Sequence, residues 1–564
     1  MPSNHLHNLL RSTISNQWTW WWEGSSNKNE LAQAVLLSIS ILLLSIFHCL
    51  KTFLKSRIRI SAPLPPGPRG LPIVGYLPFA RTNLHQQFTE LAQQYGPIYK
   101  LWFGEKLCVV LNSPSLAKEV VRDQDTVFSD RDSPIAALAA TYGGFDIAWA
   151  PYGSYWRNMR KVFVREMLSN TSLEDTYRLQ RDEVKKTIRD LHGKIGTTVE
   201  VSEITFLTVL NVVMSMLWGS TIDSQRAESI GPKFRVVILK IMELIGKPNV
   251  SDFFPILARF DVQGVERETK RLMQWVERIF DPILESRMKM SMEERKQEDG
   301  LKRKGKKDFM QVLLEFKEQE DAPIPITLQQ IKAMLMNILV GATDTTATIV
   351  EWVMAELLHK PEVMKKVQKE LSDIVGLNNV VEEFHMPKLH YLAAVLKETH
   401  RLHPAGPLLI PKRPMQSSIV GGYTVPKDTR VFLNVWAMHR DPEVWNDPSE
   451  FKPERFLSDS SKWDYSGNNF QFLPFGSGRR MGAGIPLAEK LVMHVVASLL
   501  HSFNWKLPEG EELDLSEQFG MVLKKSTPLI AIPTERYKEA KLMGENGCIH
   551  RFVSNGLRVE GLSI

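Results

Sequence analysis

The stretch FGSGRRMGAG, from Phe475 to Gly484, decides how the rest of this chain is interpreted. Within it, Arg480 carries a planar fork of hydrogen-bond donors that matches the geometry of a carboxylate. Gly482, two residues later, has no side chain and supplies no ligand to any group that the loop holds. An arginine with this donor geometry therefore stands two residues before a position that has no side-chain chemistry.

Four further motifs precede this stretch: Trp156–Arg160 (WRNMR), Gly341–Thr345 (GATDT), Glu398–Arg401 (ETHR) and Pro453–Phe456 (PERF). Together with the loop, they resemble the W-x-x-x-R, [AG]-G-x-[DE]-T, E-x-x-R, P-E-R-F and F-x-x-G-x-R-x-C-x-G motifs of the cytochrome P450 superfamily. Each pattern is weak alone, but five in the family's order over about 330 residues are not a chance agreement. The resemblance extends from Pro63 to Arg536. Within the superfamily, the residue sequences of several segments are similar to those of plant microsomal enzymes that oxidise sesquiterpenes.

The main departure from the family is Gly482 itself. The resemblance implies that this position normally holds the cysteine whose thiolate ligates haem iron and favours O–O cleavage. With glycine at this position, no side chain is available there to ligate iron, and we expect haem binding to be weakened. Ala342, where the family usually has a second glycine, is a milder departure at the same chemical centre.

The resemblance also implies roles for the other motif residues. Trp156, Arg160 and Arg480 are expected to hold the haem propionates, and Phe475, Gly482 and Gly484 to form the loop against the cofactor. The acid–alcohol pair Asp344 and Thr345 is expected to relay protons at the oxygen-binding segment. Without iron, Asp344 is a candidate general acid or base if burial raises its pKa.

Glu398 and Arg401 lie three residues apart on a predicted helix, so their side chains share one face. The resemblance adds Arg455 to them as a structural ionic cluster under the loop. Such a cluster needs every member, because an unpaired buried charge is costly. All three residues are present, so the sequence gives no sign that the fold has decayed.

Apolar segments are expected to line a pocket for a lipophilic small molecule. By resemblance they are Ile135–Ala148, Met334–Thr346, Ala405–Ile410 and Gly520–Val522. The alternative, that they are simply part of the core, stays open at this point.

The composition agrees with one large, mainly α-helical domain with small β-sheets, which we place at residues 73–536. Of the 564 residues, 43% are hydrophobic, the net charge is +6, and the basic residues are scattered, which argues against nucleic-acid binding. Strand-like runs occur at Ile98–Trp102 and Leu107–Leu111, and a capping box at Thr327 and Gln330 begins a helix that ends near His359. Only three cysteines occur (Cys49, Cys108 and Cys548), so the sequence predicts no disulfide framework and a domain that faces the cytosol.

The ends of the chain lie outside this domain. After an N-terminal segment, residues 1–30, residues 31–50 form an apolar run long enough to cross a bilayer, and the basic, proline-rich hinge 51–72 follows. Basic residues after the run predict a single-pass endoplasmic reticulum protein with a cytosolic domain. A cleaved signal peptide fits less well, because the run is long and no cleavage site follows. Residues 537–564 have no counterpart in the family and are expected to be a disordered extension.

Three functions remain open from the sequence. Gly482 favours a non-oxidative step, such as isomerisation, dehydration or cyclisation of a terpenoid-like molecule. The first alternative is an NADPH-dependent monooxygenase that hydroxylates a sesquiterpenoid with a separate reductase, if a cysteine stands at position 482 or another ligand substitutes. The second is a non-catalytic member that binds ligands or serves as a scaffold.

Overall fold

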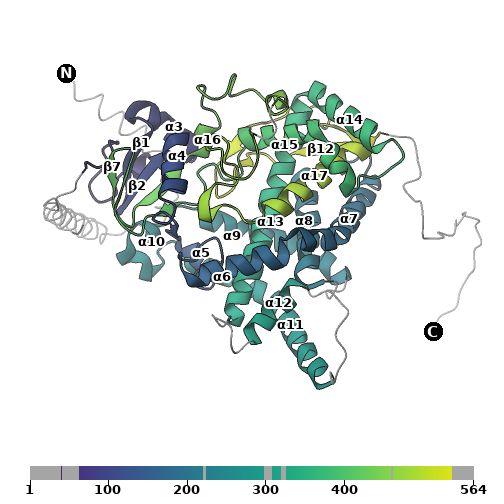
Figure 1. The fold of residues 1–564 in the computed structure, drawn as a ribbon, viewed down its shortest axis with the longest axis horizontal. Coiled ribbons are helices and arrows are strands. Elements are labelled where there is room, and N and C mark those ends of the chain that lie inside the picture. The colour runs from purple at the N-terminus through teal and green to yellow at the C-terminus, as the bar shows by residue number, and fades with distance from the viewer. Residues whose placement is uncertain are drawn as a thin grey trace, which may run out of the picture.

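The computed structural model describes residues 62–219, 224–297, 308–318, 326–458 and 462–536, together with the single residue Ser40 (Figure 1). Helices make up most of this part of the chain, and the strands form several small sheets. The predicted class, mainly α with small β-sheets, is therefore confirmed. The rest of the proposed membrane anchor, the start of the hinge and the C-terminal extension lie outside the described residues.

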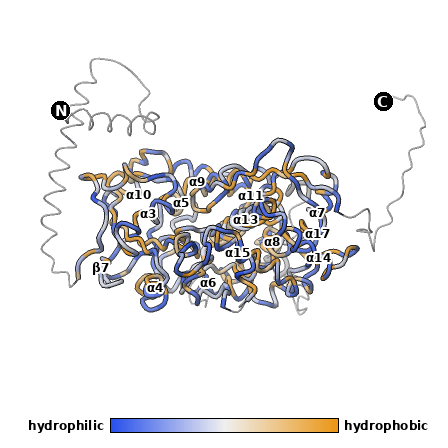
Figure 2. The backbone as a smooth tube through the Cα atoms, turned by 90° about the horizontal axis from the view of Figure 1, so that it is seen from above, coloured by the Kyte–Doolittle hydropathy of each residue, from blue (hydrophilic) through white to orange (hydrophobic). Residues whose placement is uncertain are grey.

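The long central helix α13 (Leu328–His359) organises the molecule and lies in its middle in both views (Figure 1, Figure 2). It begins as predicted, because the Thr327 hydroxyl accepts from the Gln330 amide and the Gln330 side chain accepts from the Thr327 amide. Beside it packs α8 (Val201–Trp218). Both helices are apolar and long enough to cross a membrane, yet 72% of the apolar window of α13 and 67% of that of α8 are buried inside the protein, as core helices are.

Other helices surround this pair (Figure 1). They are α3 (Leu84–Tyr95), α4 (Pro114–Lys118), α5 (Ile135–Ala140), α6 (Ser154–Val162), α7 (Asn170–His192), α9 (Ser224–Gly246), α10 (Val250–Phe253), α11 (Val265–Gln297), α12 (Phe309–Glu318), α14 (Pro361–Val375), α15 (His390–Leu402), α16 (Val435–Met438) and α17 (Ile485–Ser502).

The largest sheet has the order β1-β2-β8-β5-β3. Its strands are β1 (Ile98–Phe103), β2 (Lys106–Leu111), β8 (Arg430–Leu433), β5 (Lys412–Arg413) and β3 (Asp130–Arg131). The pairs β1–β2, β8–β5 and β5–β3 are antiparallel, and only β2–β8 is parallel. Both strand predictions are confirmed by β1 and β2, and the register of β3 with β5 places Arg131 opposite Lys412.

Three smaller sheets complete the fold. One joins β4 (Val199–Glu200), β12 (Ile530–Glu535) and β9 (Phe503–Lys506), and two hairpin-like pairs join β6 (Ser418–Val420) to β7 (Tyr423–Val425) and β10 (Glu517–Gln518) to β11 (Lys524–Lys525). The β10–β11 pair matters for the site, because Lys524 of β11 reaches a carboxylate of α13.

Candidate functional site: a cavity between the central helix and the glycine-containing loop

A cavity of about 400 Å³ lies between α13 and the loop Phe475–Gly484. All four segments expected to form pocket walls contribute to it, through residues such as Ile147, Val340, Leu409 and Met521. Its lining is mostly apolar, with a few charged groups, as small-molecule sites usually are.

The loop needs its glycines at two positions. Gly476 and Gly478 have φ of +73° and +71°, and a Cβ at Gly478 would lie 2.3 Å from the carbonyl oxygen of Val121. Gly482 differs, since a Cβ there would meet Phe475 at an ordinary 3.6 Å, and its φ lies outside the left-handed region. Gly482 therefore lines the cavity at a position where nothing in the backbone requires glycine.

Two of the predicted propionate partners line the cavity, and the third supports them. Arg480 donates to the carbonyl oxygens of Ser129 and Ala150, both at 2.6 Å, and Arg160 donates to that of Met481 at 2.8 Å. Trp156 does not line the cavity. Its indole nitrogen donates to the Ile147 carbonyl at 2.9 Å, and its ring lies 4.3 Å below the Arg480 guanidinium. Trp156 therefore packs against the Arg480 guanidinium beside the cavity.

Two further cations at the cavity, Arg131 and Lys412, belong to no sequence motif and were not predicted from the sequence. Arg131 donates to the carbonyl oxygen of Ile410 at 2.6 Å, and the neighbouring Lys412 Nζ is buried without a hydrogen-bond partner in the part of the chain that the structure describes. Burial, with repulsion from other arginines, lowers the pKa of Arg131 to about 9 and that of Lys412 to about 7. Only the pairing of β3 with β5 brings them together.

The charge balance of the lining tests whether haem fits. Four cationic side chains (Arg131, Arg160, Lys412 and Arg480) line the cavity with a single carboxylate, Asp146. Burial raises the pKa of Asp146 to about 6, and its carboxylate already accepts from the Trp149 amide and the Asn337 side chain. The arginines bond backbone carbonyls instead of carboxylates. A ligand with two carboxylates, such as haem, fits this rim.

Replacing Lys412 with methionine is expected to stabilise the haem-free protein by about 1–3 kcal/mol at pH 7, because an unpaired buried ammonium disappears. Because the pKa of Lys412 falls from 10.5 to about 7 on folding, the unfolded chain binds more protons between these values. Stability of the haem-free protein should therefore rise with pH across that window, and Lys412→Met should flatten the rise. Urea unfolding at several pH values checks this. The exposed Lys369→Met serves as control, and an unchanged slope in Lys412→Met would contradict the assignment.

Asp344 and Thr345 of α13 lie in different environments. Thr345 lines the cavity, and its hydroxyl donates to the Gly341 carbonyl at 2.7 Å, which is the bond that can distort a helix one turn back. Asp344 is not among the residues that line the cavity; its Oδ1 lies 2.6 Å from Lys524 Nζ. Its Oδ2 is buried without a hydrogen-bond partner among the described residues. Ala342 also lines the cavity.

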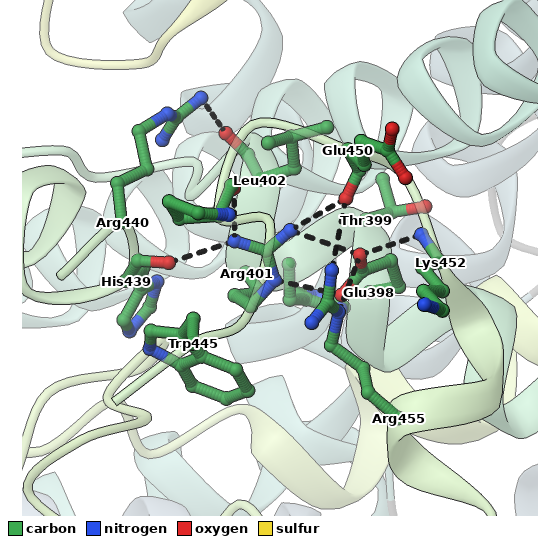
Figure 3. A network of polar contacts seen from close by, with 12 residues as sticks. Glu398, Thr399, Arg401, Leu402, His439, Arg440, Trp445, Glu450, Lys452 and Arg455 are labelled. Atoms are coloured by element: carbon green, nitrogen blue, oxygen red, sulfur yellow. Dashed lines mark hydrogen bonds and ion pairs between the residues drawn. The ribbon is translucent and has the colours of Figure 1, made fainter. Parts of the chain in front are cut away.

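Glu398, Arg401 and Arg455 meet in one buried ionic cluster (Figure 3). Arg401 donates to both carboxylate oxygens of Glu398 at 2.7 and 2.9 Å, and Arg455 adds a bond to Oε1 at 3.0 Å. The remaining donors of Arg401 reach the carbonyl oxygens of His439, Pro448 and Glu450. The cluster thus ties α15 to the segment before the loop.

One more residue of α15 belongs to the site. His400 lies between Glu398 and Arg401 in the sequence. Its side chain lines the cavity next to Phe475. In the sequence, His400 occupies only a variable position of the E-x-x-R motif.

Comparisons with known proteins agree with this geometry. Residues 65–532 match the family model described as Cytochrome P450. The chain is 38% identical to Cytochrome P450 76C2 of Arabidopsis thaliana, over 84% of this chain and 92% of that protein. It is 37% identical to a geraniol 8-hydroxylase of Catharanthus roseus, over 84% and 94% of the two chains.

Among solved structures, a zebra fish cytochrome P450 determined with abiraterone superposes with a TM-score of 0.67 at 27% identity. The match covers 80% of this chain and 100% of that one. Motifs, fold, cavity and relatives all agree: the chain belongs to the cytochrome P450 family.

Proposed function

We propose that this protein is a haem-dependent hydroxylase of plant specialised metabolism that acts on a lipophilic, terpenoid-type molecule. Electrons come from NADPH through a separate reductase at the endoplasmic reticulum membrane. The observation that carries the proposal is an apolar cavity beside α13 with an uncompensated cationic rim. The similarity to geraniol 8-hydroxylases supports the substrate class.

The residues of the cavity divide the work. Arg131, Arg160, Lys412 and Arg480 would hold the two carboxylates of haem, which supplies oxygen activation when it is bound. The apolar wall formed by α13 and residues 405–410 orients a substrate through apolar contacts and excludes water. The Thr345 hydroxyl, anchored to the Gly341 carbonyl, is placed to accept and pass on a proton at the cavity surface.

The test is a turnover assay of the full chain in membranes that contain a plant NADPH-cytochrome reductase, with geraniol and a sesquiterpene as probe substrates. We expect a hydroxylated product that needs both NADPH and oxygen. Equal product without NADPH would support a non-oxidative function instead. Saturable substrate binding with no product under either condition would support the non-catalytic alternative.

Gly482 itself favours a second candidate, the non-oxidative conversion that the sequence suggested, because the ligand position has no side chain. The positions of the expected acid–base residues support this candidate only in part. Of the two expected acid–base residues, Thr345 lines the cavity, whereas Asp344 pairs with Lys524 and is not among the lining residues.

Replacing Asp344 with asparagine is expected to leave any NADPH-independent turnover unchanged and to destabilise the fold by about 1–3 kcal/mol, because Lys524 loses its partner. Urea unfolding and the assay above measure the two effects separately. The double variant Asp344→Asn/Lys524→Met should recover part of the lost stability. Loss of turnover in Asp344→Asn, with normal turnover in Lys524→Met, would show that the carboxylate is catalytic after all.

A further inference from the structure

Among the described residues, no cysteine side chain lines the cavity next to Gly482. Cys108 is the cysteine described in this structure, and it is fully buried in β2, opposite Arg430 of β8. It does not line the cavity, and burial raises the pKa of its thiol to about 12. A thiolate from Cys108 is therefore not available to a group in the cavity.

An imidazole does lie on this side of the cavity. His400 lines the same cavity as Gly482, and its ring centroid is 5.5 Å from that of Phe475. The Phe475 side chain is in turn 3.6 Å from where a Cβ at Gly482 would stand. The imidazole and the position of the missing side chain therefore both lie next to the side chain of Phe475, and both line the same cavity.

The hydrogen bonds of His400 prepare it for coordination. Its Nδ1 lies 2.8 Å from the carbonyl oxygen of Leu396, which can only accept, so Nδ1 carries the proton. The Tyr465 hydroxyl, 3.3 Å from Nδ1, is the other polar neighbour. No hydrogen bond to Nε2 is found from any described residue. A carbonyl on Nδ1–H and a free lone pair on Nε2 are the arrangement that metal-bound histidines adopt.

The imidazole is also in the right charge state. Burial lowers the pKa of His400 to about 4, so the ring is neutral, and its lone pair is available, at physiological pH.

Other candidate ligands near the loop are already engaged. Met481 also lines the cavity, but its sulfur lies against Gly467, 2.8 Å from where a Cβ on that residue would stand. His439 Nε2 accepts from the Leu473 amide at 2.8 Å. His403 is paired with Glu356 at 2.7 Å and Glu517 at 3.2 Å. Lys412 stands at the cationic rim, where it would neutralise a carboxylate.

We propose that Nε2 of His400 would ligate haem iron in place of the side chain that Gly482 lacks, so that the chain would hold haem through an imidazole instead of a thiolate. This inference rests on haem occupying the cavity, as proposed above. A neutral imidazole donates less electron density to iron than a thiolate does, so oxygen-dependent turnover should be slower than in thiolate-bearing relatives.

The test uses the full chain purified from membranes after expression with a haem precursor, and it reads haem content and ligation separately. Haem content comes from the pyridine haemochrome assay, and ligation comes from the absorption spectrum of the carbon-monoxide complex and the iron–histidine stretch in resonance Raman spectra of the ferrous protein. We expect stoichiometric haem with imidazole-type spectra. His400→Phe keeps an aromatic ring against Phe475 and Tyr465, and it should lose the iron–histidine band and retain haem about 10- to 100-fold more weakly.

Two more variants sharpen the result. His400→Ala opens a space, and added imidazole should restore the lost band there. His494→Phe alters a buried histidine of α17 that does not line the cavity, and it should change nothing. Normal haem content with the same Raman band in His400→Phe would overturn the histidine ligand and leave haem binding intact. A wild-type protein that takes up no haem would instead overturn the proposed function on which this inference rests.

Discussion

Gly482→Cys is expected to turn this protein into a thiolate-ligated haem enzyme, the largest functional change that a single substitution can make here. The carbon-monoxide complex of the reduced variant should show the absorption band typical of thiolate ligation, which the unaltered protein should lack. NADPH-dependent turnover should rise by about 10²-fold or more, because the thiolate promotes O–O cleavage. The backbone should accept the side chain, since a Cβ at position 482 makes only an ordinary 3.6 Å contact with Phe475.

The control is Cys108→Ala, alone and combined with Gly482→Cys. Because Cys108 is buried in β2, away from the cavity, its removal should alter neither spectrum. The thiolate band in the unaltered protein would contradict the prediction and show that another cysteine reaches the iron. An unchanged spectrum in Gly482→Cys, with haem bound, would mean that the loop does not face the iron as the family resemblance implies.

The second large effect concerns stability. Arg401→Ala is expected to cost about 3–5 kcal/mol, because it leaves the buried Glu398 carboxylate without its bidentate partner. The side chains of both residues have no exposed surface, and three carbonyl oxygens lose a donor at the same time. Such a loss is a large share of the stability of a typical domain, so little folded protein should accumulate. The yield of soluble protein and the urea midpoint measure it.

A matched control is Lys369→Ala, which removes an exposed ion pair with Asp373 at a similarly short distance of 2.6 Å. Its effect should stay within about 0.5 kcal/mol, because solvent screens the pair. Arg401→Lys should keep the charge and lose most of the bonds, and should therefore fall between the two. Equal stability of Arg401→Ala and Lys369→Ala would show that the cluster does not hold α15 to the segment before the loop.

Some site residues could be predicted because a motif places them by local geometry. Thr327 and Gln330 cap α13 through bonds three residues apart, and Glu398 and Arg401 meet on one turn of α15. Arg160 and Arg480 also reach the cavity as the resemblance implied. In these cases, short-range spacing or a family motif carries the information.

Other positions depended on contacts that no motif records. Asp344 was expected at the cavity, but Lys524, 180 residues later, takes its carboxylate, and Trp156 uses its indole nitrogen on a backbone carbonyl. Lys412 reaches the cationic rim only through the β3–β5 register. His400 becomes a candidate ligand only because α15 packs its ring beside Phe475.

The sequence by itself determined the family, the mainly helical class and the absence of a cysteine at position 482, since each is written in residue identity or local spacing. Only the tertiary structure decided which side chains face the cavity. The physical reason is that burial, charge balance and a free lone pair arise between segments far apart in the chain. Among the described residues, Lys412 has no hydrogen-bond partner and His400 Nε2 is unengaged, and both features arise only because the fold directs the neighbouring polar groups to other partners.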